Sequence, residues 1–291
     1  MPRIAGAVAG RAGAIWPYRF VTSVYEKLTQ ECPDRFGIET NTPVREIRTA
    51  ASESEFPYLV ATPRGEMQTK NIVHATNGHV AHLLPRLRGK IFPLRGQMTV
   101  QSLDGEDVPA NLGSQRSWMI RHSKGYDYMT QNAATGDYFL GGGTLQAGLE
   151  DIGNSGDNEQ SFLALCHLNG VLPGLFGAGL GQSMQSSTMK SSWTGVLGFS
   201  CDGRPWVGKL PSTISQRTPK FTKRSSGGEY IAAAFCGSGM VYCWKSGQAV
   251  AAMILGKDTS WLPESLLPSE QRYCSCDVGD GAAHWLDVSI R

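Results

Sequence analysis

The chain has 291 residues, a formal net charge of +2 and only 18% charged residues. This length can supply one large domain or two, with a sizeable buried core. The charge balance says little about partners, but the lack of a dense basic patch argues against a nucleic-acid partner. No run approaches the roughly 18 apolar residues of a membrane span, so no membrane association is predicted either.

The cysteines indicate a reducing compartment. There are seven, an odd number at irregular spacing, and no Asn-x-Ser/Thr sequon occurs, which together favour a cytoplasmic protein with free thiols. The close pair Cys274 and Cys276 has no histidine nearby at zinc-site spacing. No metal site is therefore predicted.

The first third of the chain predicts a helix followed by extended segments. Pro17 stands at a first-turn position, and Phe20, Val24 and Leu28 share one face of a helix that ends near Cys32. Extended segments are predicted at 36–40 and 44–49, and a hairpin is predicted from 58–62 and 67–69.

Residues 71–78 predict a strand that stops at the Asn77-Gly78 turn. In an open α/β sheet, ligands bind beyond the carboxyl ends of the strands. The stop at Asn77 is thus either one wall of a ligand site or a simple turn.

The middle of the chain has the pattern of β-hairpins, which predicts an antiparallel sheet. A short helix carrying Phe162, Leu165 and Cys166 is predicted to end before Pro173. The predicted elements of this region are strands at 90–100, 118–120, 126–131 and 138–140, a helix at 159–169, a strand at 184–193, a Gly/Pro-rich loop at 194–208 and a mobile polar insertion at 211–228.

The stretch 229–256 predicts a buried strand, a glycine turn and a helix capped by Gly256. Such a turn brings free backbone N–H groups and the positive end of a helix dipole to one point, which suits a phosphate or an anionic ring. Gly237 and Gly239 give only G-x-G, because Tyr242 occupies the place of a third glycine. A plain strand-to-helix connection is the alternative interpretation.

Five motifs occur in the order found in flavin amine and amino-acid oxidases of the D-amino-acid oxidase type. They are TNTPVREI at 40–47, HATNGHVAHLLPRLRGKIFPLRGQM at 74–98, DYMTQNAATGDYFLGGG at 127–143, WTGVLGFSCDGRPWVG at 193–208 and the stretch 229–256. The chain resembles especially the fungal FAD-dependent oxidoreductases of this group.

The resemblance implies an α/β (α+β) fold, in which a partial FAD-binding α/β domain is interleaved with an antiparallel β-sheet substrate domain. The implied boundaries are 1–88 for the first part of the FAD-binding domain, 89–193 for the substrate domain, 194–257 for the returning FAD-binding segment and 258–291 for a C-terminal tail. The implied cofactor is FAD, and the implied partner is a small-molecule amine-type substrate.

The resemblance also implies the residues that contact the cofactor. In such proteins the position of Val44 meets the adenine, the end of the second motif lies against the FAD, and the last glycine turn lies at the flavin ring. The implied cofactor-binding residues are Val44, Ala75, Thr76, Asn77, Gly78, Gly237, Ser238, Gly239 and Met240.

For the substrate pocket the resemblance implies His122 and Tyr126, on a hairpin placed over the flavin. No catalytic residue is assigned, because a flavin carries the redox chemistry itself. Leu197 occupies the place of the arginine that holds the substrate carboxylate in amino-acid oxidases of this type. The expected reaction is oxidation of a C–N bond in an amine, an amino acid or a secondary-metabolite intermediate.

One departure from the family pattern concerns its N-terminal strand, G-x-G-x-x-G turn and helix, which have no counterpart in this sequence. An N-terminally incomplete FAD-binding domain is therefore expected, with a sheet edge and an apolar face left uncovered. Either the chain is an FAD-dependent oxidoreductase, or it is a truncated, non-catalytic fragment that cannot retain FAD. A nucleotide-binding module without redox function explains the turn at 237–240 less well.

Overall fold

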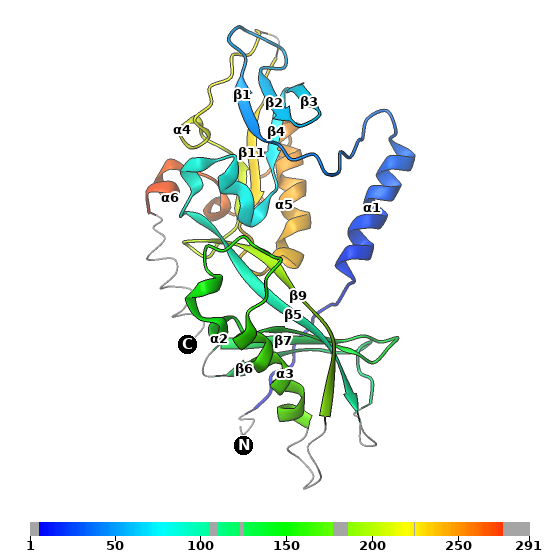
Figure 1. Cartoon of the computed structure of the whole chain (residues 1–291). Coiled ribbons are helices and arrows are strands. Elements are labelled where there is room, and N and C mark those ends of the chain that lie inside the picture. The colour runs from blue at the N-terminus through cyan, green and yellow to red at the C-terminus, as the bar shows by residue number, and fades with distance from the viewer. Residues whose placement is uncertain (1–5, 105–109, 123–124, 177–185, 224, 276–291) are drawn as a thin grey trace. The chain divides into compact units, whose positions relative to one another are not determined.

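The structure is a computed structural model that describes residues 6–104, 110–122, 125–176, 186–223 and 225–275 (Figure 1). The described chain divides into two compact units. Unit 1 holds residues 6–15 and 94–196, and unit 2 holds residues 16–93 and 197–275. The division falls within two long strands, β5 (Ile91–Asp104) and β9 (Ser186–Ser200).

Unit 1 is built on a five-stranded sheet with the order β6-β7-β8-β5-β9. Its pairs β6/β7, β7/β8 and β5/β8 are antiparallel, which confirms the predicted hairpin pattern. The remaining elements of this unit are β6 (Ser117–His122), β7 (Gly125–Gln131), β8 (Tyr138–Gly142), α2 (Thr144–Ala147), η3 (Gly148–Asp151) and α3 (Phe162–Phe176).

Helix α3 covers one face of this sheet, with Leu168 and Leu172 buried against Met129, Tyr138 and Leu140. The prediction of its end and of its apolar face was wrong. The helix continues past Pro173 to Phe176, because burial of Leu172 outweighs the single hydrogen bond that proline removes. Its buried stripe is Ala164, Leu168 and Leu172, whereas Phe162 is 76% exposed and Cys166 is also exposed.

Unit 2 contains two three-stranded sheets. The antiparallel sheet β1-β2-β3 comprises Glu46–Thr49, Tyr58–Thr62 and Gly65–Thr69. The second sheet has the order β10-β11-β4, from Trp206–Lys209, Gly228–Ala233 and Asn71–His74. Strands β4 and β11 are parallel, and β4 lies at the edge of this sheet.

The helices of unit 2 include two long ones, α1 (Pro17–Glu31) and α5 (Gly239–Ile254). Both confirm the sequence prediction, and Gly256 has the left-handed φ of +63° expected of a residue just beyond a helix end. The shorter helical elements are η1 (Asn77–His82), η2 (Pro85–Leu87), α4 (Ser212–Ser215), η4 (Glu264–Leu266) and α6 (Glu270–Ser275).

Three predicted segments of unit 2 differ from the structure. Residues 36–40 form no strand, because they pair with none of the described strands and Ile38 is 47% exposed. The predicted loop 194–208 is strand at both ends, since β9 runs to Ser200 and β10 begins at Trp206. The predicted mobile insertion begins with α4, whose Ile214 is buried in the core.

Unit 2 has a hydrophobic core on both faces of β10 and β11. One cluster surrounds Trp206, Ile231 and Leu84, and the other joins Tyr230 to Val250 of α5. The predicted tail 258–291 contributes to this core, because Leu262 is buried in the second cluster; its residues after 275, Cys276 included, lie outside the described residues. The mixed α and β fold class is confirmed. Among the described helices, none has both the length and the apolar character needed to cross a membrane.

Candidate cofactor site

Strands β4 and β11 end at the same edge of their sheet because they are parallel. His74, the last residue of β4, pairs with Ile231, two residues before the end of β11. Beyond these ends, the Asn77 side-chain oxygen accepts a hydrogen bond from the Phe235 N–H at 3.3 Å. The Gly198 carbonyl accepts one from the Cys236 N–H at 2.8 Å. The two strand ends predicted to face one ligand are thus in direct contact through Asn77 and Phe235. Gly198 of β9 also contacts the β11 end through Cys236.

Gly198 is required where these segments meet. A Cβ atom at this position would lie 2.3 Å from Asn77 Oδ1 and 2.6 Å from the Gly78 nitrogen, closer than van der Waals contact allows. Only glycine therefore lets β9 pass against the Asn77-Gly78 turn.

Backbone strain is concentrated at this carboxyl edge. Among the described residues, five other than glycine have a positive φ. Three of them lie here, namely Asn77 at 47°, Ala234 at 59° and Cys236 at 50°. Such conformations cost about 1–3 kcal/mol each and persist where the surrounding structure imposes them, frequently at ligand sites.

The first turn of α5 brings the backbone N–H groups of Gly239 and Met240 to this edge. Ser238 caps the helix without a side-chain hydrogen bond, and Gly237 before it has a φ of +79°. Gly237 and Ser238 are exposed. Because the first N–H groups of a helix have no intrahelical acceptor and carry the positive end of its dipole, this turn favours an anionic ligand group.

The remaining predicted cofactor residues lie in different settings. Ala75, Thr76 and Met240 are exposed, whereas Gly78 is buried. Val44 precedes β1 and packs against the cluster of Ile47, Tyr58 and Val60, onto which Ile72 of β4 also packs. The structure therefore brings together the β4 turn and the α5 turn, and it places Val44 beside the antiparallel sheet.

A buried ionic network supports the strands behind this edge. Glu229 in β11 is 3% exposed and accepts hydrogen bonds from Arg217 at 2.7 and 2.8 Å. Its Oε2 lies 3.0 Å from His74 Nε2, and His74 is a buried histidine at 2% exposure. Burial raises the pKa of Glu229, but the hydrogen bonds from Arg217 and His74 outweigh it, and the net pKa lies below its ordinary value.

A second ionic contact fixes the Asp-Gly-Arg-Pro turn. Arg272 of α6 donates to both oxygens of Asp202, at 2.8 and 3.0 Å, and its guanidinium lies 4.5 Å from the centre of the Trp206 ring. Burial raises the pKa of Asp202, but the hydrogen bonds from Arg272 and Ser200 lower it below its ordinary value overall. A residue of the predicted tail thus holds a turn of the predicted FAD-binding segment, and no sequence spacing pointed to this pairing.

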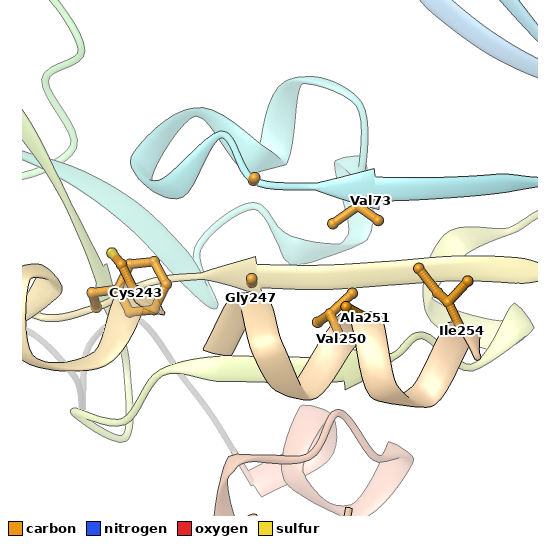
Figure 2. A pocket seen from close by; sticks show the side chains of 9 residues that line it. Val73, Cys243, Gly247, Val250, Ala251 and Ile254 are labelled. Atoms are coloured by element: carbon orange, nitrogen blue, oxygen red, sulfur yellow. The ribbon is translucent and has the colours of Figure 1, made fainter. Parts of the chain in front are cut away.

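An apolar groove of about 290 Å³ lies between β4 and α5. Figure 2 shows Val73 of β4 opposite Gly247, Val250 and Ala251 of α5, with Cys243 and Ile254 towards the ends of the groove. Val73 is 45% exposed although it belongs to a parallel strand, and such strands are normally covered. Part of the apolar face of β4 is therefore exposed.

The two predicted pocket residues, His122 and Tyr126, lie on opposite faces of the β6–β7 hairpin. His122 pairs with Gly125, and Tyr126 is the next residue along β7. Side chains alternate between faces along a strand, so the structure does not bring them together. Tyr126 is 43% exposed on the face opposite Asp127, and His122 lies beside Asp127 on the face that α3 covers.

Comparison with known proteins identifies the family. The model of the DAO family, described as FAD dependent oxidoreductase, matches residues 2–253. The chain belongs to this family. The family predicted from the motifs is confirmed, and FAD is the cofactor that membership implies. No match was found among curated proteins.

Solved structures share the fold at low sequence identity. Glycine oxidase from Geobacillus kaustophilus has a TM-score of 0.55 and 17% identity, with 79% of this chain and 52% of that chain covered. L-proline dehydrogenase from P. horikoshii has a TM-score of 0.55 and 18% identity, with 78% and 53% covered. Iminodiacetate oxidase from Chelativorans sp. BNC1 has a TM-score of 0.53 and 17% identity, with 78% and 53% covered. The chain therefore spans about half the length of these structures.

The residues at the carboxyl edge fit a flavin cofactor in three respects. Gly237 is an exposed glycine with a left-handed φ, the exposed residues Ala75 and Thr76 are small, and the first turn of α5 offers donors to an anionic group. The buried network around Glu229 supplies a rigid support for this arrangement.

Proposed function

We propose that this family member binds FAD at the carboxyl edge of β4 and β11 and oxidises a C–N bond of a small amine-type substrate. The observation that supports this most is the coincidence of three strained residues with Gly198 at one edge. Backbone strain of this kind clusters at ligand sites, so a ligand-binding role explains its concentration here.

In this proposal, the chain's own residues position the cofactor. The backbone around Ala75, Thr76 and Gly78 would lie along the FAD, and the turn Gly237 to Met240 would lie at the flavin ring, where the α5 dipole stabilises negative charge. Val44 would approach the adenine through its backbone. When bound, FAD supplies the hydride acceptor for the reaction.

The proposed division of labour is that residues 1–88 and 194–257 hold the cofactor and residues 89–193 shape the substrate pocket. Tyr126 lies on the face of β7 that α3 does not cover, so we assign this face to the substrate. His122 lies on the α3 side and is not retained as a pocket residue. The substrate class is amine-type, because Leu197 provides no guanidinium for a carboxylate.

A test is anaerobic mixing of the FAD-loaded protein with primary and secondary amines, each with and without a carboxylate. The proposal expects at least one amine with an α C–H bond to bleach the flavin absorption, and a matched amine without an α hydrogen to leave it unchanged. A protein that retains FAD while no amine bleaches it would contradict C–N oxidation. A protein that cannot retain FAD would instead favour the non-catalytic fragment.

A further inference from the structure

Three potential metal ligands converge on one point of unit 1. Asp127 Oδ2 lies 2.8 Å from His167 Nε2 and 3.3 Å from His122 Nε2. One ligand atom from each residue lies within 4.8 Å of both others. The three residues come from β7, α3 and β6, so the cluster is a product of the tertiary fold.

The two separations from Asp127 Oδ2 are close to those of a tetrahedral zinc-type site, and the two histidine nitrogens lie within 4.8 Å of each other. Zinc binds imidazole nitrogen and carboxylate oxygen at about 2.0–2.2 Å, which places neighbouring ligand atoms roughly 3.3 Å apart in a tetrahedron. The His122 to Asp127 distance already has this value, and His167 needs to withdraw by about half an ångström. The two imidazole rings are 24–28% exposed, so they have room for this adjustment.

The carboxylate of Asp127 is held in place by the backbone of β8 and the residue after it. Its side chain is 2% exposed, and Oδ1 accepts a hydrogen bond from the Gly143 N–H at 3.0 Å. A Cβ atom at Gly142 would lie 2.1 Å from the same oxygen, so glycine is what admits the carboxylate here. With Oδ1 engaged, Oδ2 is presented to both histidines, as expected of an oriented metal ligand.

We propose that His122, Asp127 and His167 bind one divalent cation of the zinc class. Two imidazoles select zinc-class metals over magnesium or calcium, which favour all-oxygen sites. The bound ion ties α3 to the β6–β7 hairpin, and the site is independent of the flavin proposal because it lies on the face of β7 opposite Tyr126.

The sequence carries no local signal for this site, because its ligands are 5 and 40 residues apart and match no short metal-binding motif. The site is formed because the side chains of His122 and Asp127 point to the same face of the hairpin, and the covering helix places His167 beside them.

The experiment is calorimetric titration of the full chain with Zn²⁺ in a non-chelating buffer. We expect one ion per chain in the wild type, and a loss of affinity of more than about tenfold in His167→Ala and in Asp127→Asn. The matched control is the double variant His79→Ala/His82→Ala, which removes two exposed histidines of η1. A second control is Cys166→Ser, which removes an exposed thiol adjacent to His167.

The proposal is supported if both controls keep the wild-type affinity for Zn²⁺ and His167→Ala loses it. Three results would overturn it. They are a wild type that binds no stoichiometric Zn²⁺, a His167→Ala protein that binds Zn²⁺ as tightly as the wild type, and a Cys166→Ser protein that loses its affinity for Zn²⁺. Thermal unfolding gives a second readout, because a ligand at a hundredfold excess over Kd raises Tm by about 5 °C in a chain of this size. That increase should be absent in His122→Ala, and an equal increase there would also contradict the site.

Discussion

The two sides of unit 2 contrast sharply. On the β10 and β11 side, charged residues are buried in complete networks, with Arg272 on Asp202 and Arg217 on Glu229. On the β4 and α5 side, apolar residues are left exposed, including Val73 at 45% and Trp244 at 63%. The first side is stable through its own contacts, whereas the second presents a surface of the kind that proteins normally cover.

The β10 and β11 side with its buried ion pairs, called the closed side below, should be the more sensitive to mutation. Arg272→Ala leaves the Asp202 carboxylate largely buried without its guanidinium, and we expect a loss of about 3–5 kcal/mol in the free energy of unfolding. Arg204→Ala is the control, because Arg204 is 54% exposed and 3.6 Å from the same carboxylate, and should cost less than about 1 kcal/mol. Urea denaturation measures both, and equal losses would contradict the distinct role of Arg272.

Adding a single methyl group at the cofactor edge should lower the stability of the protein. Gly198→Ala forces the Asn77-Gly78 turn away from β9, and we expect a loss of about 1–3 kcal/mol in the free energy of unfolding. Gly195→Ala lies three residues earlier in β9, where a new Cβ meets nothing within 4 Å, and should have little effect. The denaturant midpoints of the two variants measure these losses. A Gly198→Ala protein as stable as Gly195→Ala would show that the edge is not closely packed.

The closed side should also weaken in acid. The pKa of Glu229 lies below its ordinary value of 4.5 in the folded state, so its stabilisation is complete above that pH and is lost as the pH falls through the lowered pKa. The free energy of unfolding should therefore fall below about pH 4.5. Glu229→Gln should show a smaller decline over the same range in urea titrations, and an unchanged slope would count against this role.

The β4 and α5 side, called the open side here, should tolerate truncation of its exposed side chains. Val73→Ala removes a side chain that is already exposed, so we expect a change within about 0.5 kcal/mol in the free energy of unfolding. Val250→Ala, in the same groove but 3% exposed, should cost about 2 kcal/mol. Similar losses for the two would mean that Val73 is covered in solution.

The sequence predicted those elements that have a strong local signal. Pro17 marked the start of α1 and Gly256 the end of α5, and period-two patterns located the hairpins. It failed where tertiary contacts decide, as in α3, which passes Pro173 because Leu172 is buried. The Arg272 to Asp202 pair and the His122, Asp127 and His167 cluster join residues far apart in the chain, and no local pattern encodes them.

The most direct test of the cofactor proposal is a titration of the full chain with FAD, followed by the visible absorption of bound flavin after removal of free cofactor. The account predicts about one FAD per chain, retained in Gly195→Ala and lost or strongly weakened in Gly198→Ala. A wild-type protein that remains colourless with excess FAD, or a Gly198→Ala protein that binds FAD as tightly as the wild type, would contradict the proposed site.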